Sequence, residues 1–196
     1  MTLRRCFINW ILLLILFSSA SGQNFNRPVP KYIPPYEFVL YDTSYQGYFL
    51  TTPFKLGDAS PNTPKPVMIL DAKGYLSWYM LSDARNLLDF KFFPEHQLYS
   101  FIKYQTPDDI NFMLMDPGFQ LVDSFTTTNG FAPDPHDFQI TAGQTYLLTG
   151  ISDSIMDLSA YLFNGVPGSP ATHAIGFVIQ EFDQNHNLLF QWNSND

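Results

Sequence analysis

Three segments of this chain repeat one ten-residue frame, and this repeat limits the possible fold more than any other feature of the sequence. Each segment begins with an aspartate, has a glycine or asparagine two or three positions later, a leucine five positions later and a large apolar residue nine positions later; the segments are residues 71–80, 116–125 and 183–192. Each follows an apolar run. The frame predicts a β-hairpin in which the aspartate accepts hydrogen bonds from turn N–H groups and the glycine or asparagine is left-handed.

A second kind of hairpin alternates with the first. Residues 89–99 run parallel, without a gap, to residues 137–147, and both segments begin with Asp-Phe. In the second copy Phe138 and Ile140 alternate with polar residues, which predicts a half-buried strand, and residues 142–144 supply a turn. One hairpin of each kind makes a unit of four strands, so we expect an all-β protein.

The spacing of these units is typical of a β-propeller. Asp71 and Asp116 lie 45 residues apart, which is the length of one four-stranded blade. The next interval, to Asp183, is longer by 22 residues, and we attribute the excess to an insertion at about residues 151–174. No sustained helical period occurs, and residues 152–162 are the best candidate for one or two helical turns.

We therefore expect residues 37–196 to form an incomplete β-propeller of about three four-stranded blades. A propeller closes with at least about four blades and more often with six to eight. Three units leave open sheet edges and an uncovered face, which natural proteins avoid. We interpret the chain as the amino-terminal part of a longer protein or, alternatively, as one member of an assembly that completes the ring.

The amino terminus has the three-part layout of a secretory signal peptide. Two arginines precede an apolar run over residues 7–17, and small residues follow it. We predict a signal peptide over residues 1–22, a proline-rich leader over residues 23–36, and export to the periplasm, the cell surface or the medium. The apolar run is too short to span a bilayer, so we expect no membrane insertion after cleavage. The single cysteine, Cys6, lies in the signal, which leaves the mature chain without a disulfide.

The charge balance excludes nucleic acid as a partner. The chain has 10 basic and 18 acidic residues, for a formal net charge of −8, and no basic stripe offsets the acidic surface. Hydrophobic residues make up 45% of the chain and aromatic residues 17%, which is enough apolar material for a packed core. No phosphate-cradling glycine loop and no Gly-x-Ser-x-Gly elbow occurs, so nucleotide chemistry and serine hydrolysis find no support.

Several stretches together resemble one family, the arylsulfotransferases built on a six-bladed β-propeller. The first is a Gly-Tyr-x-Leu strand at residues 47–50, followed by an Asp-x-x-Gly turn and an apolar-Trp pair within residues 69–78. The second is His-Asp-Phe-x-Ile-Thr at residues 136–141, followed by Leu147-Leu148. The third is the hairpin of residues 178–194. The resemblance covers roughly residues 45–196 and corresponds to the amino-terminal portion of the family.

The resemblance implies an exported enzyme that transfers a sulfuryl group between phenolic compounds through a histidine intermediate. Its partners are then a small phenolic sulfate donor and a phenolic acceptor, and no cofactor is needed. The family's nucleophile lies in a later blade, beyond residue 196, so the resemblance gives His136 a catalytic part in sulfate binding or proton transfer rather than in attack. We expect the chain alone to give no turnover.

His136, Asp137 and His173 are the candidate substrate-binding residues. From the residues alone, the alternative for His136 is a strand-start histidine bonded to Asp137 or to a backbone carbonyl. Asp137 either orients the imidazole or satisfies backbone donors, as its counterpart Asp89 must do without a preceding histidine. His173 is a candidate to reach the propeller channel from the insertion. No close ligand spacing supports a metal site, and we expect none.

The remaining histidines and the aromatic residues leave room for a second function. His96 and His186 are expected to be solvated turn residues. Aromatic residues either stack on a substrate or pack between blades; they are Tyr45, Tyr48, Tyr75, Trp78, Tyr79 and Trp192. The alternative function is a non-catalytic secreted propeller that acts as a binding or adhesion module.

Overall fold

The computed structural model describes residues 23–26, 29–53 and 65–196, and within these ranges every regular element is a β-strand. The all-β prediction is therefore confirmed. The predicted signal peptide, residues 1–22, lies outside the described residues. At the start of the leader, β1 (Gln23–Asn26) pairs antiparallel with β2 (Glu37–Leu40), the strand that follows the leader. Across the described ranges no helix is long and apolar enough to cross a membrane.

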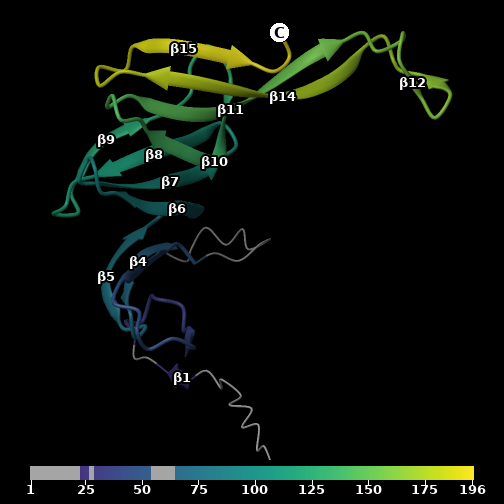
Figure 1. The fold of residues 1–196 in the computed structure, drawn as a ribbon. Helices are drawn as coiled ribbons and strands as arrows, with labels where there is room; N and C mark the ends of the chain where they lie inside the picture. The colour runs from purple at the N-terminus through teal and green to yellow at the C-terminus, as the bar shows by residue number, and fades with distance from the viewer. Residues whose placement is uncertain (1–22, 27–28, 54–64) are drawn as a thin grey trace, which may run out of the picture.

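Three larger antiparallel sheets follow one another along the chain (Figure 1), and each strand pairs with the one before it in its sheet. The first sheet contains β3 (Tyr48–Thr51), β4 (Lys65–Asp71) and β5 (Leu76–Ser82). The second contains β6 (Asn86–Phe93), β7 (Leu98–Thr106), β8 (Asp109–Met115) and β9 (Leu121–Phe125). The third contains β10 (Ala132–Ile140), β11 (Tyr146–Met156), β14 (Thr172–Phe182) and β15 (Leu188–Asn193).

The expected insertion is a two-stranded arm. Strand β11 continues through Met156 and stays paired with β14 as far as Thr172, and the arm extends beyond the rest of the third sheet (Figure 1). A short hairpin of β12 (Leu162–Phe163) and β13 (Val166–Pro167) forms its tip. The expectation of helical turns over residues 152–162 is therefore wrong: residues 152–156 are paired with β14, and the β-branched Ile155 suits a strand.

The repeated aspartates shape their turns as the sequence predicts. Oδ1 of Asp71 accepts hydrogen bonds from the backbone N–H groups of Lys73 and Tyr75, each at 2.8 Å. Asp116 accepts one from the N–H of Gln120 at 2.9 Å. Oδ1 of Asp183 accepts hydrogen bonds from the backbone N–H groups of Asn185 and Asn187, each at 2.8 Å. These bonds supply partners for turn N–H groups that no neighbouring strand pairs.

The left-handed residue of each turn is the third after the aspartate. It is Gly74 in the first copy, with φ of 77°, but Phe119 in the second and His186 in the third, with φ of 60° and 63°. The prediction is thus right for Gly74 and wrong for Gly118 and Asn185. A non-glycine residue in this conformation costs about 1–2 kcal/mol. Ring stacking offsets that cost: Phe119 lies 4.2 Å from Trp78, and His186 lies 4.3 Å from Phe125, between ring centroids.

The Asp-Phe hairpins match each other, with one residue fewer in the second turn. Lys91 pairs with Ser100, whereas its counterpart Gln139 pairs with Leu147 rather than with residue 148. The alignment without a gap therefore fails at the turn. Both first strands also shift register at the Asp-Phe step, between Leu88 and Lys91 in β6 and between residues 133 and 138 in β10.

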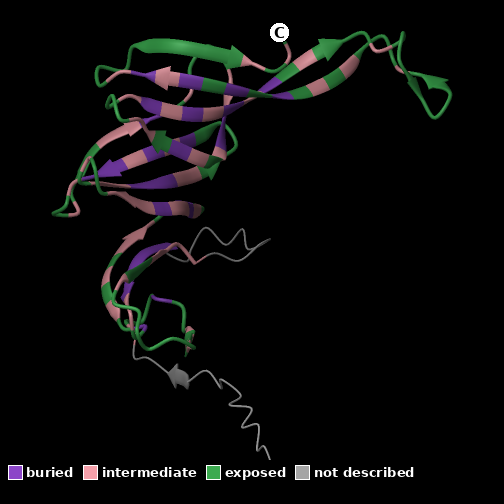
Figure 2. Cartoon of the chain, in the orientation of Figure 1, coloured by how far each residue is buried: buried purple, intermediate pink, exposed green. Residues whose placement is uncertain are grey.

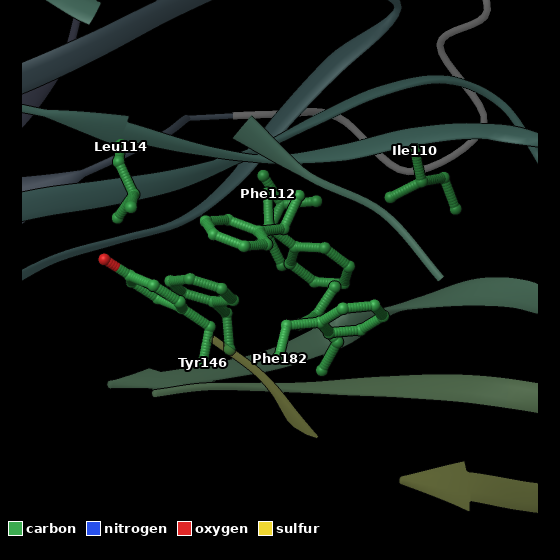
Figure 3. Packing of buried hydrophobic residues seen from close by; sticks show 9 residues of the cluster. Ile110, Phe112, Leu114, Tyr146 and Phe182 are labelled. Atoms are coloured by element: carbon green, nitrogen blue, oxygen red, sulfur yellow. The ribbon is translucent and has the colours of Figure 1, made fainter. Parts of the chain in front are cut away.

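Two cores lie between successive sheets. The first core joins the first and second sheets and includes Val67, Leu87, Phe101 and Met115. The second core joins the second and third sheets, and Figure 3 shows Ile110, Phe112 and Leu114 of β8 facing Tyr146 and Phe182 of the third sheet. A smaller cluster, with Ile33 at its centre, places the leader against the opposite face of the first sheet. Each sheet therefore buries apolar residues against its neighbour in the chain.

The outward face of the third sheet is uncovered, as expected from the sequence. Phe177, Ile179 and Trp192 are 61%, 36% and 48% exposed (Figure 2). The repeat frame aligns them with Ile110, Phe112 and Phe125 of the second sheet, which are buried in the second core and at most 2% exposed. The same positions of the repeat are thus buried in one sheet and open in the next.

The first sheet differs from the expectation of four strands in each unit. It contains three strands among the described residues, because no Asp-Phe strand precedes β3. The sequence itself holds three copies of the ten-residue frame but two copies of the Asp-Phe hairpin.

Candidate functional site

His136 lies in the irregular part of β10, where the pairing with β11 is interrupted between Pro133 and Phe138. Its side chain is 85% exposed, and its Nδ1 contacts Oδ1 of the buried Asp134. The hydroxyl of Thr149 donates to the carbonyl oxygens of Asp134 and Asp137, at 3.1 Å and 3.3 Å. This hydroxyl holds the irregular backbone on both sides of the histidine.

The contact with Asp134 gives the imidazole a defined chemistry. A carboxylate that accepts the Nδ1 proton fixes the tautomer and leaves the Nε2 lone pair directed away from it. The carboxylate also stabilises the imidazolium that forms when Nε2 takes up a proton. His136 is therefore arranged as a base or nucleophile whose reactive nitrogen faces solvent.

Asp137 has other partners than the histidine. Its Oδ1 accepts hydrogen bonds from Lys91 Nζ at 2.8 Å, from the Phe138 N–H at 2.9 Å and from Gln139 Nε2 at 2.8 Å. Of the two sequence interpretations, the bond to a backbone donor is the one observed. Asp134 takes the place beside the imidazole that sequence reasoning offered to Asp137.

Lys91 links the first strands of two sheets. Its Nζ lies 2.7 Å from Oδ2 of Asp89 and 2.8 Å from Oδ1 of Asp137, so one ammonium group bridges the two equivalent aspartates of the repeat. Sequence reasoning identified neither Lys91 nor Asp134. Neither contact leaves a local sequence pattern. Asp134 and His136 lie where β10 is irregular, and Lys91 contacts Asp137 across two sheets.

The two aspartates that share Lys91 have opposite pKa shifts. Burial raises the pKa of Asp89 above its ordinary value, and its bond and attraction to Lys91 offset this only in part. Burial also acts to raise the pKa of Asp137, but hydrogen bonds from Lys91, Gln139 and the Phe138 N–H together hold it below the ordinary value.

The ionised form of Asp137 thus stabilises the fold at pH values above its unfolded pKa, and this contribution is lost as pH falls through the folded pKa. For Asp89 the sign is reversed: stability falls as pH rises from its unfolded pKa through its folded pKa.

We expect carboxyl carbon NMR titration to show Asp137 ionising at a lower pH than Asp89. In Lys91→Met both midpoints should rise, because the ammonium group lowers the pKa of both carboxyls. Lys103→Met serves as the control and should leave both midpoints in place. Titration of Asp89 below Asp137, or midpoints that do not respond to Lys91→Met, contradicts the arrangement.

His173 lies away from His136. It stands on the arm, where it pairs with Ile155, and its Nδ1 lies 2.9 Å from Oδ1 of Asp153. Thr149, which holds the backbone beside His136, is six residues from Ile155 along β11. At a strand rise of about 3.4 Å per residue this is about 20 Å. In the described structure, Asp134 and His136 therefore lie on β10, and Lys91 links β6 to β10. His173 lies on the arm of the third sheet, away from them.

Two of the pockets formed by described residues lie between successive sheets. An apolar pocket of about 500 Å³ lies between the first and second sheets; it is lined by Tyr48, Leu50, Ile69, Ser77, Trp78, Phe92, Tyr99 and Phe119. A polar pocket of about 670 Å³ lies between the second and third sheets beside His186, whose Nε2 is 3.1 Å from Oδ1 of Asp123. His186 is thus exposed but packed, and the aromatic residues at the first pocket both pack between sheets and line an open space.

Among residues 23–26, 29–53 and 65–196, no group of three or more His, Cys, Asp or Glu side chains is arranged to hold a metal ion. Comparison with models of protein families, with curated proteins and with solved structures finds no match for this chain.

Proposed function

We propose that this chain is part of an exported arylsulfotransferase-type β-propeller, in which His136 acts with Asp134 in sulfuryl transfer between phenols. The observation that carries the proposal is the His136–Asp134 contact, which leaves Nε2 of an exposed imidazole free to accept a proton. Three antiparallel sheets in series, with β6 lying beside both β3 and β10, support the arrangement as successive propeller blades.

The local charge favours proton transfer over sulfate binding for His136. Lys91 already contacts two carboxylates, and with Asp134 nearby the first strands carry more negative than positive charge. Such a site repels a sulfate ester unless other groups supply positive charge. We therefore assign to His136 the proton transfers of both halves of the reaction. In the first half the nucleophile of a later blade bonds to sulfur, the S–O bond of the donor ester breaks, and protonated His136 gives its Nε2 proton to the oxygen of the departing phenol. In the second half the acceptor oxygen bonds to sulfur, the bond between sulfur and the nucleophile breaks, and Nε2 takes up the proton of the acceptor phenol, so that donor ester and acceptor phenol become donor phenol and acceptor ester.

The test is transfer of sulfate from a nitrophenyl sulfate to phenol, measured on the protein together with the part of the propeller that supplies the nucleophile. His136→Ala should lower kcat/KM by about one to three decades, or about 1.4–4 kcal/mol of transition-state stabilisation. Asp134→Asn should lower it in the same direction, because the imidazolium loses its partner. His96→Ala, at a turn residue, is the control and should keep full activity.

Two results count against the proposal. Full activity of His136→Ala removes the role assigned to the imidazole. Measurable turnover by this chain alone contradicts the assignment of the nucleophile to a later blade.

A second candidate function, a non-catalytic binding module, is favoured by a different observation. The outward face of the third sheet exposes Phe177, Ile179 and Trp192, and the arm exposes further apolar residues. A contiguous apolar face of this kind marks sites of protein association. Absence of any sulfate transfer, combined with association through this face, selects the second candidate.

A further inference from the structure

Among the described residues, the first sheet lacks the strand that opens each of the other two sheets. Strand β3 corresponds to β7 and β11, because each of these pairs with the strand that ends at the repeated aspartate: Phe49 with Leu70, Tyr99 with Met115, and Tyr146 with Phe182. In the second and third sheets, β6 and β10 pair with the other edge of β7 and β11. Among residues 23–26, 29–53 and 65–196, no strand pairs with that edge of β3.

The apolar pocket lies beside this open edge. Two of its lining residues, Tyr48 and Leu50, come from β3, and no charged side chain lines it. In the second sheet, the counterpart of Tyr48 is Leu98 of β7. Phe93, at the end of β6, pairs with Leu98. Phe93 packs against the second core, with its ring centroid 6.3 Å from that of Phe138. In the second sheet, Phe93 of β6 therefore fills the space that corresponds to this pocket.

We infer that the free edge of β3 is an acceptor site for an extended peptide strand, which pairs antiparallel with β3 and inserts one aromatic side chain into this pocket. The occupant is a strand of the same pattern as β6. The established pairing of β6 with β7, and its packing against the next sheet, is the template for both its direction and its register. Strand addition of this kind takes affinity from backbone hydrogen bonds and specificity from side-chain pockets.

The charges at the edge specify a second residue of the occupant. In β6, Lys91 precedes Phe93 by two positions, faces the same side and contacts Asp137 of the following first strand. The equivalent residue of a strand on β3 stands opposite Leu50 and faces Asp89, the counterpart of Asp137. Asp89 shares Lys91 with Asp137, and burial raises the pKa of Asp89. The acceptor site therefore favours the pattern Lys-x-aromatic. Because β3 has four residues, backbone pairing alone is short, and the aromatic anchor decides the affinity.

The test uses a synthetic peptide with the sequence of β6, Asn-Leu-Leu-Asp-Phe-Lys-Phe-Phe, with added terminal lysines for solubility. It is titrated into the purified protein in which Trp10 and Trp192 are replaced by phenylalanine, so that Trp78 at the pocket reports binding. We expect a saturable shift of Trp78 emission with micromolar affinity. A peptide with alanine in place of its last phenylalanine should bind at least about tenfold more weakly. A peptide that keeps the terminal lysines but has alanine in place of its internal lysine should bind more weakly and with a smaller salt dependence than the parent peptide.

A matched pair of protein variants locates the peptide. Tyr48→Glu places a charge in the pocket wall and should abolish the response, whereas Tyr79→Glu, at an exposed residue of the same sheet outside the pocket, should preserve it. Equal binding by a scrambled peptide, or an unchanged response in Tyr48→Glu, overturns the proposal. So does a protein that elutes as a dimer and gives no response until it dissociates, since a second copy then occupies the edge.

Discussion

Replacing Phe138 with alanine is expected to lower the free energy of unfolding by about 3–5 kcal/mol. The side chain is 1% exposed and lies at the centre of the second core. Its ring stacks on Phe112 at 5.5 Å between centroids, and the rings of Phe93 and Phe125 each lie 6.3 Å away. Deletion of the ring leaves a cavity between two sheets whose backbones are fixed by strand pairing, so the surrounding structure relaxes only in part.

Urea unfolding followed by far-ultraviolet circular dichroism measures this loss. Val122→Ala is the control, because Val122 is 53% exposed on β9 and its substitution should change stability by no more than about 0.5 kcal/mol. A loss below about 1 kcal/mol in Phe138→Ala means that the second and third sheets do not depend on a shared core. Phe138 directly follows His136 and Asp137 on β10. The variant therefore also tests whether the second core fixes the position of β10.

The parts of the fold that sequence predicts are those set by local chemistry. An aspartate followed by turn residues satisfies its own turn, and Asp71, Asp116 and Asp183 do so as expected. Alternation of apolar and polar residues places Phe138 inward and Gln139 outward. The spacing of the repeat locates the insertion, but its conformation depends on the pairing of β11 with β14, and a short segment with no sustained period does not predict that pairing.

The candidate site is less predictable because its contacts cross between elements. The bridge from Lys91 to Asp137 exists only when two sheets pack with their first strands adjacent. The contact of His136 with Asp134 depends on an irregular backbone that no residue pattern encodes directly. Phe119 takes the left-handed conformation although Gly118 stands beside it, because stacking on Trp78 of the previous sheet favours that placement. Distant packing outweighs local preference at each of these positions.

The repeat allows one position to be compared in two environments. Phe125 and Trp192 are equivalent in the ten-residue frame, but Phe125 is 2% exposed in the second core and Trp192 is 48% exposed on the uncovered face. We expect Phe125→Ala to lower the free energy of unfolding by about 3–5 kcal/mol, and Trp192→Ala to lower it by no more than about 1 kcal/mol. The difference is expected from burial, because both residues are aromatic and both occupy the last strand of an antiparallel sheet.

The same pair of variants reports on association when unfolding is measured at several protein concentrations. If another polypeptide or a second copy covers the outward face, the stability of the protein rises with partner concentration and Trp192→Ala removes that rise. If the face stays open, the midpoint is independent of concentration, and the small cost of Trp192→Ala is constant. A cost of Trp192→Ala that equals that of Phe125→Ala at every concentration contradicts the exposed face itself, because an open tryptophan has too few contacts to lose so much on truncation.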